Sequence, residues 1–109
     1  MRMAIKAKRR YLLVECSTAI GESDRALFER RLCGALLAQI GAMHYHSVNP
    51  KITGFVNERR FVMRASLEGH KDLVLALAMT KRLDGTETAF YTLKSSGTIR
   101  ALLKEGSKA

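Results

Sequence analysis

The hydrophobic positions change their spacing several times along the chain, and each change marks an expected element. Residues 9–16, RRYLLVEC, form a compact apolar run followed by turn-forming residues, which predicts a first strand. In residues 24–40 the apolar side chains recur every three to four positions between charged ones, which predicts an amphipathic helix. Ser23 or Asp24 is expected to cap this helix, and Gly41 is expected to end it.

The second half of the chain repeats the alternation of strand and helix patterns. Residues 49–67 contain two β-type runs around a polar connection at 57–59, which predicts a hairpin, and Gly54 within the first run indicates a bulge. A second helical period starts at His70 and is expected to close at a glycine, Gly85. The segment TETAFYTLK then predicts a fourth strand, followed by a short terminal helix.

The resulting order, β-α-β-β-α-β plus a terminal helix, predicts an α+β fold. Two helices on one face of a four-stranded antiparallel sheet, the ferredoxin-like two-layer sandwich, is the economical solution, with the first and third strands central. We expect one domain over residues 9–105, with basic flexible ends at 1–8 and 106–109.

Two helices cannot cover both faces of such a sheet. The candidates for the open face are Leu13, Phe61 and Met63, to be covered either by a protein partner or by the terminal helix.

Charge adds the strongest compositional signal. The chain has 19 Lys and Arg against 10 Asp and Glu, a formal net charge of +9, which favours a polyanionic partner. Residues 2–10 hold five of these cations and no acid, although a solvated basic leader would have the same composition. No apolar run has the length of a membrane span and no signal-peptide core follows the basic start, so we expect a cytoplasmic protein with no membrane contact. Cys16 and Cys33 are expected to be buried, reduced thiols.

The search for catalytic chemistry in the sequence finds little. His44 and His46 lie in a stretch with a strand-like pattern and His70 opens a helix, but no Cys or carboxylate completes a metal-ligand spacing around them. No nucleophile elbow, carboxylate pair or phosphate-binding glycine loop is evident. Tyr11 is the one aromatic of the first strand, a position more typical of packing than of base stacking.

The segment LKSSGTIRALLKE, residues 93–105, carries the most distinctive local pattern. A turn that enters a helix can hold an anion, because the first helical turn leaves N–H groups unpaired and presents the positive end of the dipole. We expect Gly97 to adopt a backbone conformation closed to other residues, Ser96 and Thr98 to add hydroxyl donors, and Arg100 to add a charge-assisted bond. The alternative is that Thr98 only caps the helix and Arg100 is solvated.

Two of these segments resemble a known family. RYLLVE at residues 10–15 and SGTIR at 96–100 are similar to the two signatures of ribonuclease P protein component 2, an archaeal relative of a eukaryotic ribonuclease P and MRP subunit. The resemblance extends over nearly the whole chain. It departs from the family at Gly54 and the connection NERR, which leaves the contacts of that hairpin loop open.

The resemblance implies a non-catalytic subunit of the ribonucleoprotein endonuclease that removes the 5′ leader from precursor tRNA. The RNA and its bound magnesium would do the chemistry, and the protein itself would bind no cofactor. It also implies ribonuclease P protein component 3 as a partner, a two-plus-two assembly with it, and indirect contact with precursor tRNA. The residues expected to bind ribonuclease P RNA are Lys6, Lys8, Arg9, Arg10, Tyr11, Lys94, Ser96, Gly97, Thr98 and Arg100.

Two other functions stay open on the sequence alone. One is a ferredoxin-like regulatory module whose SSGT turn binds a small anionic metabolite, and the other is an assembly subunit that contacts only proteins. A steep dependence of RNA binding on salt would distinguish the first from an RNA-binding protein.

Overall fold

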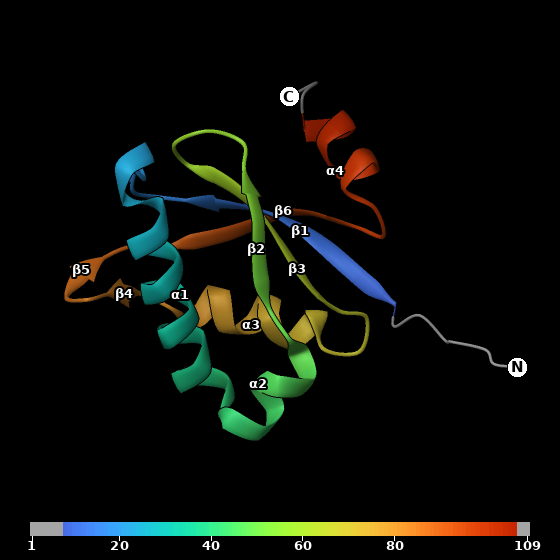
Figure 1. Cartoon of the computed structure of the whole chain (residues 1–109), viewed down its shortest axis with the longest axis horizontal. Coiled ribbons are helices and arrows are strands. Elements are labelled where there is room, and N and C mark those ends of the chain that lie inside the picture. Colours follow the sequence, from blue (N-terminus) through green and yellow to red (C-terminus); the bar gives the residue numbers. More distant parts are fainter. Residues whose placement is uncertain (1–7, 107–109) are drawn as a thin grey trace, which may run out of the picture.

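The computed structural model describes residues 8–106, and its centre is a four-stranded antiparallel sheet (Figure 1). The strands are β1 Arg9–Cys16, β2 Lys51–Phe55, β3 Arg60–Ser66 and β6 Phe90–Ser96, in the spatial order β2-β3-β1-β6. The first strand and the hairpin's second strand are therefore central, which confirms the predicted ferredoxin-like topology.

Two helices cover one face of this sheet. They are α1, Arg25–Ile40, preceded by the short 3-10 turn Glu22–Asp24, and α3, His70–Met79. Their fully buried leucines pack against alternate residues of the central strands, so the side-chain period of two in the strands meets the period of 3.6 in the helices. The largest of these buried side chains are Leu32, Leu36, Leu73 and Leu77 from the helices and Leu12, Val14, Phe61 and Met63 from the strands.

The opposite face is covered in part by the terminal helix α4, Ile99–Gly106. Leu102 is fully buried there against Leu13 and Val62, with Tyr11 packed beside them. Leu13 thus lies on the predicted face, whereas Phe61 and Met63 point into the α1–α3 core, so the prediction for these two was wrong. Side chains alternate between the two faces along a strand, and paired residues of neighbouring strands share a face. Because Val62 pairs with Leu13, its neighbours Phe61 and Met63 point to the opposite face.

Residues 42–48 form a helix, not the strand-like stretch expected around His44 and His46. Gly41 ends α1 with a φ of 93°, and α2, Ala42–Val48, starts directly after it. The alternating pattern imitates a strand, but the left-handed glycine reverses the chain into a second helix. His44 Nε2 lies 2.6 Å from Asp72 Oδ2 and ties α2 to α3.

The second predicted helix is shorter than its sequence pattern. It ends at Met79, and Thr80 closes it with a hydroxyl bond to the Ala76 carbonyl. Asp84 and Gly85 have φ values of 51° and 84°, so Gly85 lies in the turn of a small hairpin instead of ending the helix. The hairpin strands are β4 Arg82–Leu83 and β5 Thr86–Glu87, and the last sheet strand starts only at Phe90.

The two edge strands of the sheet each contain one extra residue. In β2 the register shifts between Ile52 and Gly54, which confirms the bulge near Gly54, and the Thr53 hydroxyl donates to the Val62 carbonyl at 3.3 Å. In β6 the pairing with β1 shifts where Leu13 and Val14 face Lys94 and Thr92.

Both cysteines are free, with Cys16 buried and Cys33 partly buried. Within residues 8–106, no helix combines the length and apolar character needed to cross a bilayer.

Candidate nucleic-acid interface

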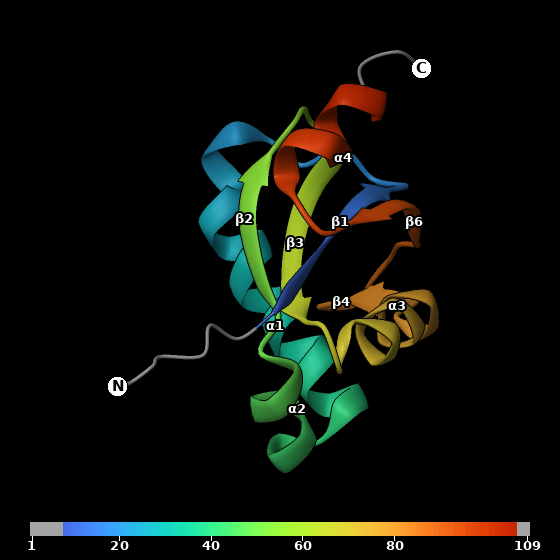
Figure 2. The same cartoon turned by 90° about the vertical axis from the view of Figure 1, so that its right-hand side faces the viewer.

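The fold brings the basic start of β1 next to the end of β6. Tyr11 pairs with Ser96 in the antiparallel register, so segments about 85 residues apart in the sequence are neighbours at one end of the sheet. From Ser96 the chain passes through Gly97 and Thr98 into α4, which rises away from this end (Figure 2). The start of the first signature, at Arg10 and Tyr11, therefore lies beside the start of the second, at Ser96 and Gly97. The surface around them is called here the basic end, and its residues are Lys8, Arg9, Arg10, Tyr11, Lys94, Ser96, Gly97, Thr98 and Arg100.

Arg10 links the two segments directly. Its Nε and Nη2 atoms donate to the Ser95 hydroxyl at 3.2 and 3.0 Å. Its Nη1 atom lies 3.9 Å from the position that a Cβ on Gly97 would occupy. A guanidinium held beside the turn in this way presents its remaining N–H groups to whatever approaches the turn.

The SSGT turn is organised by its own hydroxyl groups. The Ser96 Oγ accepts a bond from Thr98 N at 3.3 Å, and the Thr98 Oγ1 accepts one from Ala101 N at 3.2 Å. Thr98 is thus the N-cap of α4, as the alternative interpretation proposed. Both hydroxyls act as acceptors in these bonds, so each retains a hydrogen that can be donated outward.

Gly97 does not have the backbone conformation expected from the sequence. Among the described residues, the glycines with positive φ are Gly41 and Gly85, so Gly97 lies in a region that other residues can adopt. The prediction of a glycine-only conformation was wrong. A Cβ at this position would lie 3.9 Å from Arg10 Nη1, an ordinary van der Waals contact, so neither the φ angle nor steric crowding explains the glycine.

The first turn of α4 completes this part of the surface. Ile99 and Arg100 occupy the first two helical positions, where backbone N–H groups have no acceptor within the helix. The Arg100 side chain is exposed beside them. The structure therefore gathers a helix start, two hydroxyls and two guanidiniums around one turn.

The other predicted residues lie around this turn, with one exception. Lys8 and Arg9 are exposed at the start of β1, and Lys94 and Tyr11 are half-buried on the α4 face. Lys6 lies outside the described residues. The sequence grouped these positions by charge and by family resemblance, and the strand register now shows that Lys94 to Ser96 lie beside Tyr11 to Leu13.

Two cations at this end were missed. Arg64 pairs with Tyr11 on one side and with Lys51 on the other, so both belong to the same cross-strand row as Tyr11 and Ser96. The signal was present in the alternation of RFVMRAS, where Arg60, Val62 and Arg64 share one face. This alternation alone does not place Arg64 beside Tyr11, because that also requires the register between β3 and β1.

Several cations of the basic end form no ion pair within residues 8–103. Ion pairs among the described residues engage Arg31, His44, Arg60 and Arg82 with carboxylates. No ion pair in residues 8–103 involves Arg9, Lys51, Arg64 or Arg100. Adjacent cations without carboxylate partners repel one another, and an approaching polyanion relieves that repulsion.

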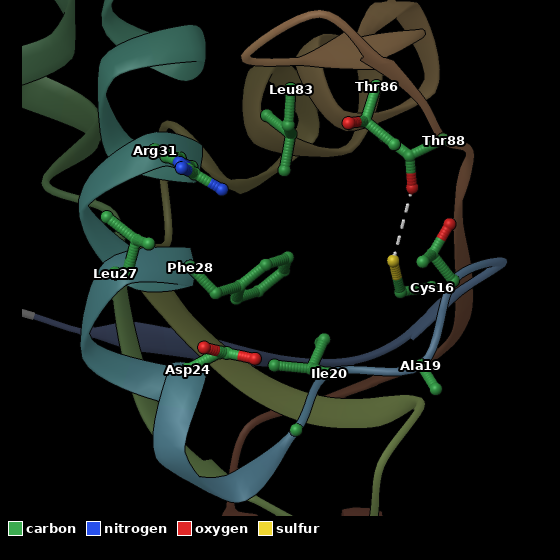
Figure 3. A pocket seen from close by; sticks show the side chains of 12 residues that line it. Cys16, Ala19, Ile20, Asp24, Leu27, Phe28, Arg31, Leu83, Thr86 and Thr88 are labelled. Carbon is green, nitrogen blue, oxygen red and sulfur yellow. Dashed lines mark hydrogen bonds between the residues drawn. The ribbon is translucent and has the colours of Figure 1, made fainter.

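A pocket of about 240 Å³ lies at the other end of β1 (Figure 3). Phe28 and Leu27 of α1, Ile20 and the hairpin residue Leu83 give it apolar walls, while Asp24 and Arg31 lie at its polar side. The Cys16 thiol lies 3.3 Å from the Thr88 hydroxyl inside it, and Arg31 is bound to Asp84 at 2.9 Å. The pocket is therefore separate from the SSGT turn, where a regulatory module was expected to bind its anion.

The described side chains form no group of three His, Cys, Asp or Glu residues that could hold a metal ion. His44 lies against Asp72, and the His70 Nδ1 lies 2.7 Å from the Leu67 carbonyl. The basic end, in contrast, combines positive charge with N–H and hydroxyl donors, the groups that anions accept hydrogen bonds from.

Comparisons with known proteins agree with a basic ferredoxin-like domain. A chain in the cryo-EM structure of yeast ribonuclease MRP superposes with a TM-score of 0.64 at 12% sequence identity, over 97% of this chain and 93% of that one. No curated protein sequence matches significantly.

The sequence profile described as the Rpp14/Pop5 family matches residues 10–106. The chain belongs to the Rpp14/Pop5 family, which contains protein subunits of ribonuclease P and MRP, ribonucleoprotein endoribonucleases. The family resemblance inferred from the sequence is thereby confirmed.

Proposed function

We propose that this protein is a non-catalytic subunit of ribonuclease P that binds the catalytic RNA through its basic end. In this role it supports removal of the 5′ leader from precursor tRNA, while the RNA and its magnesium carry out the hydrolysis. The observation that carries the proposal is a set of cations near the SSGT turn that form no ion pair within residues 8–103, namely Arg9, Lys51, Arg64 and Arg100, in a chain of the Rpp14/Pop5 family.

The physical role follows from charge. Folded RNA brings phosphates close together, and each lysine or arginine that binds a phosphate releases condensed counterions and lowers the repulsion. In this proposal Arg10, which lies beside Gly97, and Arg100, in the first turn of α4, would bind one phosphate in the turn, with the Ser96 and Thr98 hydroxyls as additional donors. Contacts of this kind position an RNA without reading its bases.

The proposal includes a protein partner and a place in the cell. We propose that ribonuclease P protein component 3 binds this chain, in a two-plus-two assembly, and that the complex is cytoplasmic. The similarity to a chain of the yeast ribonuclease MRP complex supports an assembly that contains both RNA and protein partners.

A reconstitution experiment tests the function. Ribonuclease P RNA should cleave precursor tRNA at low magnesium only when the protein is added, and the protein alone should cleave nothing. The triple variant Arg9→Gln/Arg10→Gln/Arg100→Gln should lower both RNA affinity and cleavage, because it removes three cations of the basic end. Filter binding at several salt concentrations should show a slope reduced by up to about 0.9 for each lost phosphate contact.

The control removes the same charge elsewhere. Arg30, Lys81 and Arg82 are exposed residues of α1 and the β4 region, away from the SSGT turn. Their triple replacement by Gln should leave the salt slope and the cleavage rate near those of the unmodified protein. Equal effects of the two triple variants would show that only net charge matters and would contradict the proposed site.

The regulatory alternative is distinguished by the same titration. A module that binds a small anionic metabolite at the SSGT turn would bind RNA weakly and without a steep dependence on salt. Neither triple variant would then affect precursor tRNA cleavage.

A further inference from the structure

The sheet face beside α4 carries a row of four side chains, and only one of them, Ser96, belongs to the SSGT turn. Lys51, Arg64, Tyr11 and Ser96 are paired across β2, β3, β1 and β6, one residue from each strand. Because opposite residues of antiparallel strands point to the same face, these four side chains form one row, called here the Tyr11 row. At about 4.8 Å per strand the row spans roughly 15 Å.

The row lies at the uncovered part of this face. α4 packs its Leu102 over Leu13 and Val62, the next row of the sheet, and rises from there away from the start of β1 (Figure 2). Tyr11 contacts the edge of this small cluster and is half-buried, so one side of the ring is supported and the ring is not enclosed. Lys51 is exposed and Arg64 half-exposed beside it.

The charges of the row select a negatively charged occupant. Within residues 8–103 neither Lys51 nor Arg64 forms an ion pair, and the row contains no carboxylate. The nearest acid on this face of β1 is Glu15, which is already bound to Arg60 at 2.9 Å. An aromatic ring flanked by unpaired cations and a hydroxyl is the combination that binds single-stranded nucleic acid, since every base has a face that can stack.

We propose that the Tyr11 row binds an unpaired nucleotide of RNA, with its base stacked on Tyr11 and its backbone phosphates held by Arg64 and Lys51. This deepens and rests on the proposed function, because it adds a site for unpaired RNA to a surface assigned to phosphate contacts. A duplex cannot fill the row in the same way, since its base faces are covered by neighbouring base pairs. Tyr11 was among the residues expected to bind RNA, and the proposal gives it base stacking, the role that its strand position alone did not favour.

Tyrosine fluorescence provides a direct test, because the chain has three tyrosines and no tryptophan. In the variant Tyr45→Phe/Tyr91→Phe only Tyr11 emits. Titration with a decamer of uridylate should quench this emission, and an RNA duplex with the same number of phosphates should quench it far less. Tyr11→Ser should weaken decamer binding about tenfold, and Tyr11→Phe should retain it.

Tyr91 is the matched control for the aromatic ring. It lies on the same face, is 53% exposed and pairs with Glu15, so its cross-strand neighbour on β1 is a carboxylate, whereas Tyr11 pairs with Arg64. Tyr91→Ser should bind the decamer as the unmodified protein does. Arg64→Gln, which leaves the Tyr11 packing in place, should lower the salt slope by about 0.7 if it removes one single-strand phosphate contact.

Decamer binding without quenching of Tyr11, or equal affinity of Tyr11→Ser and the unmodified protein, would overturn the inference. So would a protein that binds only the duplex. In each of these cases the reconstituted cleavage and its dependence on Arg9, Arg10 and Arg100 would be unaffected, so failure here is distinguishable from failure of the proposed function.

Discussion

Arg10 and Ser95, 85 residues apart in the sequence, are joined by two hydrogen bonds from one guanidinium to one hydroxyl. The bonds orient a cation at the start of β1 toward the turn after β6. The hydroxyl thus acts as a positioning group, and the cation supplies the charge.

This relationship predicts different results for its two partners. Arg10→Gln should weaken RNA binding and lower the salt slope by about one unit, because a charge is lost. Ser95→Ala should weaken binding less and leave the slope unchanged, because the charge remains and only its orientation is freed. Filter binding against salt concentration measures both quantities, and a smaller slope in Ser95→Ala would argue against a purely positioning role.

The docking of α4 depends on Leu102. This side chain is fully buried against Leu13 and Val62, and a buried Leu→Ala change removes about 2–5 kcal/mol of packing. Because the cluster is separate from the main core, Leu102→Ala should release α4 with a smaller change in global stability. Hydrogen exchange of the Leu102 amide, which bonds to the Thr98 carbonyl, should accelerate while core amides such as Met63 stay protected.

Leu103 is the control for this change, since it is 37% exposed on the same helix. Leu103→Ala should leave the exchange of the Leu102 amide nearly unchanged. If Leu102→Ala lowered the urea midpoint of the whole domain without altering exchange in α4, separate docking of this helix would be refuted.

Two glycines should respond oppositely to alanine. A Cβ on Gly69 would lie 2.8 Å from the Val48 Cα and Cγ2 atoms and 2.9 Å from the Ser66 Oγ, so Gly69→Ala should destabilise the domain by about 1–3 kcal/mol. Gly34 lies inside α1 with no atom within 4 Å of its added Cβ, so Gly34→Ala should stabilise it by about 0.5–1 kcal/mol. Urea unfolding of both variants gives the comparison, and a neutral Gly69→Ala would mean that α2 can shift.

Tyr45 predicts a loss of stability in alkali. Burial, together with a hydrogen bond to Cys33, raises the pKa of Tyr45 to about 12 from its usual value of 10.0. The unfolded chain then loses this proton first, so the stabilising contribution is complete below pH 10 and is lost as the pH rises toward 12.

Unfolding of the unmodified protein and of Tyr45→Phe should therefore be compared at pH 9 and 11.5. The unmodified protein should lose more stability than the variant over this interval. Absorbance at 295 nm should show one tyrosine ionisation near pH 12 in the unmodified protein, and this step should be missing in Tyr45→Phe. Parallel pH curves for the two proteins would exclude a raised pKa.

The sheet, its strand order and the two core helices follow from hydrophobic spacing, because each element buries one face and its period is visible in the chain. The wrongly predicted element boundaries lie where a residue with positive φ turns the chain. Gly41 turns a strand-like pattern into α2, and Asp84 with Gly85 makes a hairpin where a helix end was predicted.

The candidate site was predictable to the extent that its signals are local. Arg9 and Arg10 at the start of β1 and the SSGT turn are visible in the sequence, and the structure places these two segments together. Arg64 and Lys51 were not found, because their position beside Tyr11 depends on how β1, β2 and β3 pair, which the sequence does not show. The conformation of Gly97 was also predicted wrongly, because a glycine in a turn need not have a positive φ.

The extra residues in the two edge strands affect how the molecule behaves at high concentration. A strand from another copy can extend a sheet only along an edge that offers its backbone groups in one continuous register. In β2 the register breaks after Ile52 and the exposed Lys51 adds charge, and in β6 it breaks beside Thr92. Both edges are thus poor templates for fibre-like growth, which keeps a chain with 47% hydrophobic residues from aggregating strand by strand.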